Sequence, residues 1–156
     1  MDHEQLLAEL AGEEVELQFD SFTNETALQV GLGLIDQAKL EGKSVTIDIR
    51  RGEQQLFHYA CPGTSADNDD WVMRKARVVN RFGISSYRME VELRAANTTL
   101  AERYSLLPSL YAPYNGAFPI YARGFGVIGT IAVSGLPGDQ DHKLITSVLR
   151  KIITGN

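Results

Sequence analysis

Residues 123–137 carry the strongest structural signal in this chain and read RGFGVIGTIAVSGLP. The apolar run from Phe125 to Ser134 predicts a strand, and its glycines suggest turn geometry and close approach of neighbouring backbone. Arg123-Gly124 predicts a tight turn, so we expect a hairpin with residues 118–122. Asp139, Asp141 and His142 then begin a closing helix over residues 139–153, which has a regular apolar stripe.

The sequence before this hairpin predicts alternating helices and strands. Helices are expected over residues 2–11, 23–40, 68–82 and 85–97, and strands over 15–19, 45–50 and 54–60. Gly31 and Gly33 lie inside the second helix, where we expect them to permit close packing on a sheet. Asp67 or Asn68 is the expected cap of the third helix. Residues 108–116 predict an ordered loop that serves as a lid or an oligomer contact. Hairpin connections dominate, which indicates an antiparallel sheet packed by helices.

Composition indicates one globular domain without general affinity for polyanions. The 156 residues are 44% hydrophobic and 22% charged, which suits a single domain over residues 1–156. The formal net charge of −5 speaks against nucleic acid or an anionic membrane as a partner. Neither an export signal nor a membrane-spanning run is recognised, so we expect a cytoplasmic protein. The single cysteine, Cys61, is interpreted as a small filler at a strand end.

Lys75 is the most unusual residue of the predicted helix over 68–82. At 100° per residue it falls near the centre of an apolar face that includes Trp71 and Val78. One interpretation is that its stem covers the edge of the core while the ammonium reaches solvent or pairs with a carboxylate such as Asp48. The other is that the cation faces a pocket and binds an anionic ligand.

A basic stripe, defined by Arg74, Arg77 and Arg81, follows another flank of the same helix at i, i+3 and i+7. It is either a solvated or inter-subunit ion-pair surface or a site for phosphate or carboxylate. Because no interleaved aromatic residues or known reader motif accompany the stripe, nucleic acid is not an expected partner.

The three histidines, His3, His58 and His142, show no metal-ligand spacing. His58 is interpreted as a structural strand residue, with haem or metal ligation as the alternative. His142 is the better site candidate because it lies in the first turn of the last helix, although capping and exposure are the simpler expectation.

The glycines of the opening stretch match a dinucleotide fingerprint only in part. Gly124, Gly126 and Gly129 continue into a strand and not into a helix N-terminus, so no nucleotide cofactor is predicted. Ser134 and Gly135 are more informative, because their backbone N–H groups could line an anion niche at the start of the last helix.

Two blocks of the sequence, considered as a pair, carry a family resemblance. They are Gly63-Thr64-Ser65-Ala66-Asp67-Asn68 with Trp71, Arg74, Lys75 and Arg81-Phe82-Gly83, and Phe118-Pro119-Ile120 with Gly124, Gly126, Ile128-Gly129 and Val133-Ser134-Gly135-Leu136-Pro137. The pair resembles the GlcG/HbpS-like family, often labelled haem-degrading domain proteins, and especially its compact cytosolic branch. The similarity extends from about Leu28 to Ile153. It implies an α/β fold of the α+β type, a profilin-like sandwich with a five-stranded antiparallel sheet and flanking helices. It also implies symmetric homo-oligomers, and haem as a cofactor of some relatives.

These observations together predict a cytosolic, oligomeric protein that binds or senses a small anionic ligand. The predicted ligand-binding residues are Asp48, Asn68, Trp71, Lys75, Ser134, Gly135 and His142. No catalytic or metal-binding residue is predicted. Two alternatives stay open. One is a haem-degrading or redox enzyme, and the other is a protein-interaction scaffold that uses Tyr111, Tyr114 and the basic stripe.

Overall fold

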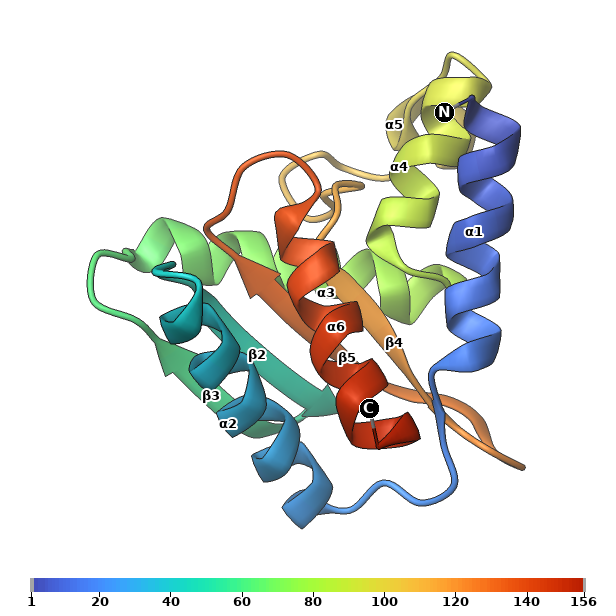
Figure 1. Ribbon diagram of the computed structural model, residues 1–156. Helices are drawn as coiled ribbons and strands as arrows, with labels where there is room; N and C mark the ends of the chain where they lie inside the picture. Colours follow the sequence, from blue (N-terminus) through green and yellow to red (C-terminus); the bar gives the residue numbers. More distant parts are fainter. Residues whose placement is uncertain (1, 156) are drawn as a thin grey trace.

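The structure is a computed structural model that describes residues 2–155, and it has a central sheet with helices on both faces (Figure 1). The helices are α1 (His3–Glu16), α2 (Asn24–Leu40), α3 (Ala66–Phe82), α4 (Ser86–Ala95), α5 (Leu100–Tyr104) and α6 (Gln140–Thr154). The strands are β1 (Gln18–Phe19), β2 (Thr46–Arg51), β3 (Gln54–Ala60), β4 (Ala117–Ala122) and β5 (Gly126–Ser134).

The sheet has five strands in the order β1-β4-β5-β2-β3. Both predicted hairpins are confirmed, because β2 pairs antiparallel with β3 and β4 pairs antiparallel with β5. The sheet is mixed, however, and not wholly antiparallel as expected. Gln18 and Phe19 of β1 pair in parallel with Tyr121 and Ala122 of β4. A two-residue strand carries no periodic signal, so its direction follows from where α1 places the chain.

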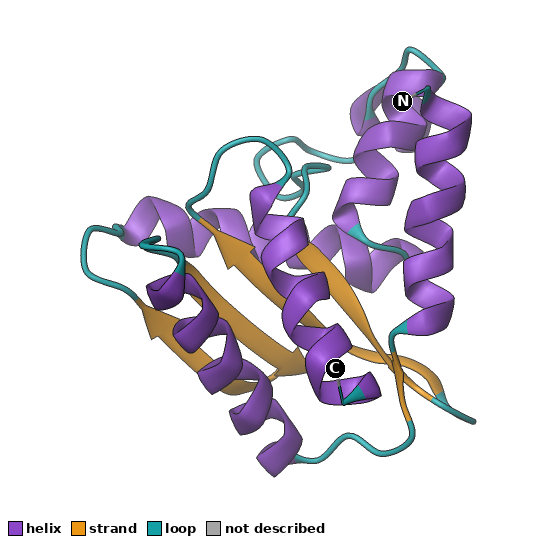
Figure 2. Ribbon diagram, in the orientation of Figure 1, coloured by secondary structure: helices purple, strands orange, loops and turns teal. Residues whose placement is uncertain are grey.

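The helices divide into two layers. Figure 2 shows α2 and α6 across the near face of the sheet and α3 on the far face. The α2–α6 layer covers the large core, which includes Leu34, Ile47 and Ile145. On the other face, Val72 and Val79 of α3 pack with Ala117 and Ala132 of the sheet. The alternating side chains of each strand therefore supply both layers, as in an α+β sandwich.

Helix α1 is longer than its sequence predicts. It continues through Gly12 to Glu16, where the apolar alternation of residues 15–19 had indicated a strand. Three tertiary contacts hold its last turns. They are a hydrogen bond between Glu13 and His142 at 2.8 Å and ion pairs of Glu14 with Arg88 at 2.9 Å and of Glu16 with Arg150 at 3.2 Å. These contacts outweigh the local preference of residues 12–16 for ending the helix, because most helical stability in a folded protein comes from tertiary packing.

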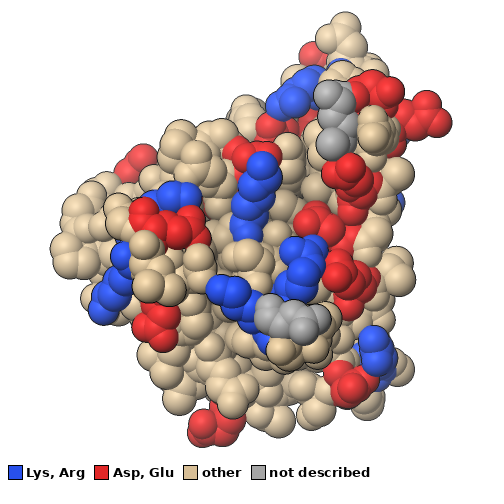
Figure 3. Space-filling view, in the orientation of Figure 1, with Lys and Arg blue, Asp and Glu red and all other residues tan. Residues whose placement is uncertain are grey.

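The outer surface carries both signs of charge. Figure 3 shows Lys and Arg side chains interspersed with Asp and Glu over the face that α2 and α6 cover. In the part of the chain that the structure describes, no helix is both long and apolar enough to cross a membrane.

Gly31 permits close packing on the sheet, as predicted, whereas Gly33 faces helix α6 and not the sheet. A Cβ atom at Gly31 would overlap the Phe57 ring of β3, and one at Gly33 would lie 3.0 Å from Val148 Cγ1 of α6. We expect Gly31→Ala to lower the free energy of unfolding by about 1–3 kcal/mol, because the added methyl overpacks this contact. Urea denaturation measures the change.

Gly12→Ala is the matched control for this prediction. Gly12 also lies inside a helix, but no atom would lie within 4 Å of its added Cβ. The substitution should raise the free energy of unfolding by about 0.5–1 kcal/mol through helix propensity alone. Equal effects of the two substitutions would contradict the close packing of α2 on β3.

Candidate functional site

Five of the seven predicted ligand-binding residues lie around one open hollow of about 390 Å³. This Lys75 hollow is bounded by α3, by the loop before β4 and by the turn between β5 and α6. The five residues are Asn68, Trp71, Lys75, Ser134 and Gly135, and Asp67, Tyr114, Asn115, Leu136 and Asp141 complete the lining.

The start of α3 sets one wall of the Lys75 hollow. Ser65 caps the helix, and not Asp67 or Asn68 as expected. Asn68 instead completes the capping box, because its Oδ1 accepts a hydrogen bond from the Ser65 N–H at 3.0 Å. Its Nδ2 donates to Ser134 Oγ at 3.2 Å. The cap therefore fixes Asn68 against the end of β5, which lies 66 residues away in sequence.

Lys75 forms the floor of the hollow and is only 3% exposed. Its ammonium donates to the carbonyl oxygens of Asn115 and Val133 and to Asp141 Oδ2, which lies 3.3 Å away. A lysine ammonium has three hydrogens, and these three protein acceptors use them. The acidic partner of Lys75 is Asp141 and not Asp48, which was the suggested carboxylate.

Burial perturbs both members of this ion pair. Desolvation lowers the pKa of Lys75, and the nearby Asp141 carboxylate opposes that shift. Desolvation likewise raises the pKa of Asp141, while Lys75 and the backbone N–H groups of Leu136 and Gly135 oppose the change. Asp67 and Asp141 line the hollow together with Lys75, its one basic residue, so the hollow has no excess of positive charge to attract an anion.

Aromatic side chains form the outer wall of the hollow. Trp71 meets Tyr114 edge to face, with the ring centroids 6.0 Å apart. The Arg74 guanidinium lies 4.6 Å from the centroid of the Trp71 ring.

The basic stripe has a structural role along this wall. Arg74 donates to the carbonyl oxygen of Pro108, and Arg77 Nη1 donates to that of Leu110 at 3.2 Å. Two of the three arginines therefore hold the predicted ordered loop against α3.

Asp48 lies outside the hollow in a separate polar cluster. It is 1% exposed and accepts hydrogen bonds from Arg50 Nε at 2.8 Å and Gln55 Nε2 at 2.7 Å. His58 Nδ1 lies 3.3 Å from Asp48 Oδ1, and His58 Nε2 lies 3.0 Å from Asp69 Oδ1. This arrangement agrees with the structural interpretation of His58.

His142 also lies outside the hollow, although it adjoins Asp141 in sequence. It is 2% exposed, and its Nε2 lies 2.8 Å from Glu13 Oε1 of α1. Its ring contacts Tyr87 and Phe118 at centroid distances of 5.1 and 5.9 Å. The expectation of an exposed capping residue is therefore wrong, and His142 joins α6 to α1.

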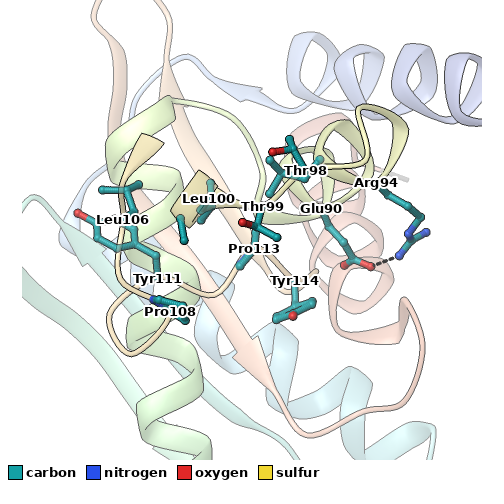
Figure 4. Close-up of a pocket in the computed structure, with 12 residues that line it drawn as sticks. Glu90, Arg94, Thr98, Thr99, Leu100, Leu106, Pro108, Tyr111, Pro113 and Tyr114 are labelled. Carbon is teal, nitrogen blue, oxygen red and sulfur yellow. Dashed lines mark hydrogen bonds and ion pairs between the residues drawn. The ribbon is translucent and has the colours of Figure 1, made fainter. Parts of the chain in front are cut away.

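A second cavity, the α4–α5 pocket, was not predicted from the sequence. It has a volume of about 370 Å³ and lies between α4, α5 and the loop that precedes β4. Its lining consists of Glu90, Leu93, Arg94, Thr98, Thr99, Leu100, Ala101, Leu106, Pro108, Tyr111, Pro113 and Tyr114. Figure 4 shows the Glu90–Arg94 ion pair at one end and Leu106, Pro108 and Tyr111 at the other. Tyr114 lines both cavities, so the two are neighbours.

Helix α5 closes this pocket, and the sequence carries a local signal for it. Thr99 caps the helix by accepting a hydrogen bond from the Glu102 N–H at 3.1 Å. Threonine followed three residues later by glutamate is the spacing of a capping box. The lining itself could not be predicted, because it combines α4 with a loop more than ten residues further along the chain.

We expect Lys75→Met to lower the free energy of unfolding by about 3–5 kcal/mol at neutral pH, because it leaves the buried Asp141 charge without its cation. Chemical denaturation tests this. Lys143→Met is the matched control, since the Lys143–Asp139 pair at 3.1 Å involves a lysine side chain that is 70% exposed. That control should cost less than about 1 kcal/mol. Equal costs would contradict the central role of the buried pair.

The Lys75→Met variant should also become relatively more stable as the pH falls from 7 towards 4. Burial raises the pKa of Asp141 above its usual 3.8, and removing Lys75 takes away the main opposing charge. The folded state then binds more protons than the unfolded state, so acidification favours folding. Unfolding free energies of wild type, Lys75→Met and Lys75→Met/Asp141→Asn should be compared at several pH values. The double variant should not show this recovery, and an identical recovery would locate the titrating group elsewhere.

Comparison with known proteins identifies the family that shares this architecture. The family described as "Haem degrading protein HbpS-like" matches residues 22–150. A UPF0303 protein of Streptomyces avermitilis is 45% identical over 148 residues, which cover 95% of this chain and 91% of the relative. The crystal structure of Ybr137w protein superposes with a TM-score of 0.89 at 28% identity, covering 96% of this chain and 88% of that one. The crystal structure of a PduOC:heme complex shares the fold, with a TM-score of 0.71 at 14% identity over 83% of this chain and 93% of that one. The resemblance seen in the sequence is thus confirmed, and the chain belongs to the HbpS-like family.

Proposed function

We propose that this protein binds a small amphipathic molecule of the haem class, with an apolar body and a carboxylate group, in the α4–α5 pocket. The observation that carries the proposal is the composition of the pocket wall. Leu93, Leu100, Leu106 and Pro113 supply apolar surface, and Arg94 stands at the rim. Specific ligand sites are typically apolar cavities with a few polar groups that orient the ligand.

The size and charge of the pocket support this ligand class. Its volume of about 370 Å³ lies within the range of small-molecule sites. The Arg94 side chain is 56% exposed and pairs with Glu90 at 2.6 Å, so its guanidinium can also reach a carboxylate at the pocket mouth. The Lys75 hollow supports an anionic ligand less well, because protein acceptors already use the ammonium hydrogens of Lys75.

Two tyrosines of the α4–α5 pocket fit haem as ligands of its iron. Tyr111 and Tyr114 line the pocket, and tyrosine is an established axial ligand of haem iron. His58 and His142 lie elsewhere and face carboxylates. Bound haem would supply a redox-active iron, and a tyrosine of the loop before β4 would hold it. The PduOC:heme complex shows that a protein of this fold takes haem, which supports the proposal.

Ala101→Trp should weaken haemin binding at least about tenfold, because the indole fills the α4–α5 pocket. Ala101 is exposed and lines the pocket, so the change removes no core contact. Ala8→Trp is the matched control on the exposed face of α1. Titration followed by Soret absorption measures both affinities. Equal affinities of the two variants, or no saturable band in wild type, would overturn the proposed site.

The polar part of the site is tested in the same assay. Arg94→Ala should weaken haemin binding, whereas Arg123→Ala should not, although the Arg123 side chain is similarly exposed at 57% and pairs with Asp20. Protoporphyrin IX without iron, followed by fluorescence quenching, separates pocket filling from iron ligation. If only haemin binds, then Tyr111→Phe and Tyr114→Phe should identify the iron ligand.

A further inference from the structure

Three arginines near the C-terminal ends of α3 and α5 have no carboxylate partner. Arg77, Arg81 and Arg103 form no ion pair among residues 2–155. The ion pairs that arginines do form in this part of the chain belong to Arg50, Arg74, Arg88, Arg94, Arg123 and Arg150. The whole chain has 20 acidic and 15 basic side chains, so a group of unpaired arginines makes a local positive surface on an acidic protein.

Packing between α3 and α5 brings these arginines together. Phe82 directly follows Arg81, and its ring centroid lies 4.8 Å from that of Tyr104. The guanidinium carbon of Arg103 lies 5.6 Å from the centroid of the same Tyr104 ring. At 100° per residue, Arg77 lies about 40° from Arg81 around the axis of α3, one turn earlier. The three arginines therefore gather around the junction of the two helices.

Two exposed leucines adjoin the arginines. Leu107 is 59% exposed and Leu110 is 43% exposed. The Leu110 N–H donates to the Leu107 carbonyl oxygen at 3.0 Å, so a tight turn holds these two residues close together. Arg77 Nη1 donates to the Leu110 carbonyl oxygen at 3.2 Å, which ties the turn to α3. We call Arg77, Arg81, Arg103, Leu107 and Leu110 the basic–apolar patch.

The arginines of the patch retain hydrogen-bond donors that the protein does not use. A guanidinium has five N–H groups, and Arg77 gives one of them to the loop before β4. Arg81 and Arg103 are exposed, and their side chains donate no hydrogen bond within residues 2–155. Glu102 is next to Arg103 in sequence, but its carboxylate accepts a hydrogen bond from Thr98 Oγ1 at 3.3 Å instead. The patch thus presents charged donors to an external acceptor.

We propose that the basic–apolar patch docks an acidic peptide segment of another protein, with carboxylates that meet the arginines and apolar side chains that cover the leucines. Arg77 and Arg81 are separated by about 6 Å along the axis of α3. Residues two apart in an extended peptide are separated by about 6.6 Å on one face. Two such carboxylates can therefore each accept a bidentate pair of hydrogen bonds from one guanidinium. Arginine clusters recognise acidic motifs in this way.

Charge and composition favour a short acidic peptide over an extended polyanion. The formal net charge of −5 opposes the approach of a membrane surface or a nucleic acid, whose charge extends far beyond the patch. Exposed apolar surface rimmed by polar groups is typical of interaction sites, and leucine side chains make no favourable contact with a phosphate backbone. None of the five patch residues lines the α4–α5 pocket, so this proposal is independent of the proposed haem site.

Selection from a displayed library of random linear peptides tests the patch. Wild type should enrich peptides that combine Asp or Glu with large apolar residues, and fluorescence anisotropy then measures the affinity of one selected peptide. Arg81→Glu and Arg103→Glu should each weaken its binding at least about tenfold, and Leu107→Ser should weaken it as well. Arg51→Glu is the matched control, because Arg51 also forms no ion pair among residues 2–155 but lies at the end of β2. Selected peptides without acidic residues, or equal affinities of the Arg81→Glu and Arg51→Glu variants, would overturn the proposal.

Further probes separate an acidic peptide from other anions. The selected peptide with its Asp and Glu replaced by Asn and Gln should lose binding, because the guanidinium groups then face no charge. Vesicles of phosphatidylcholine with phosphatidylglycerol, and polyuridylate, should not compete with the acidic peptide. Competition by either probe that Arg81→Glu abolishes would assign the patch to polyanions and overturn the peptide proposal. Far-ultraviolet circular dichroism confirms that each variant is folded, and the neutral variants Arg81→Gln and Arg103→Gln repeat the test without reversing a charge.

Discussion

The buried ion pair between Lys75 and Asp141 is the contact on which the arrangement of layers depends. Lys75 belongs to α3 on one side of the sheet, and Asp141 belongs to the first turn of α6 on the other. The same ammonium binds the carbonyl oxygens of Val133 at the end of β5 and of Asn115 in the loop before β4. One side chain therefore joins four segments that are distant in sequence. Such a pair contributes specificity more than net stability, since removing either charge alone leaves the other buried without compensation.

This contact gives the Lys75 hollow a structural role, which is why the proposed ligand site is the α4–α5 pocket. In the hollow, polar groups are already satisfied by the protein itself, including Asn68, Ser134 and Asp141. In the α4–α5 pocket, apolar walls surround space that the protein does not fill. The loop before β4 borders both cavities and is tied to α3 by Arg74 and Arg77.

Much of the fold followed from local patterns. The apolar alternation of β2 and the glycine-marked turn before β5 predicted both hairpins, and amphipathic stripes predicted α2, α3 and α6. The errors have identifiable causes. Ion pairs with Arg88 of α4 and Arg150 of α6 extend α1 beyond Gly12. The two residues of β1 are too few for their direction to be read from a pattern, and the five residues of α5 are too few to show a helical period.

For the candidate site, helical periodicity alone was enough to mark Lys75 as anomalous, because a charged residue on an apolar face is visible without tertiary knowledge. Helical periodicity could not identify the carboxylate that pairs with Lys75. Asp48 and Asp141 are both acidic, and the choice depends on how α6 returns over the sheet. Asp141 and His142 are neighbours in sequence, yet they meet α3 and α1 respectively. The sequence by itself determined most of the helices and strands, both hairpins and the unusual position of Lys75 on an apolar helix face. Only the tertiary structure decided which groups meet, because burial and ion pairing depend on distances between segments that local patterns do not contain.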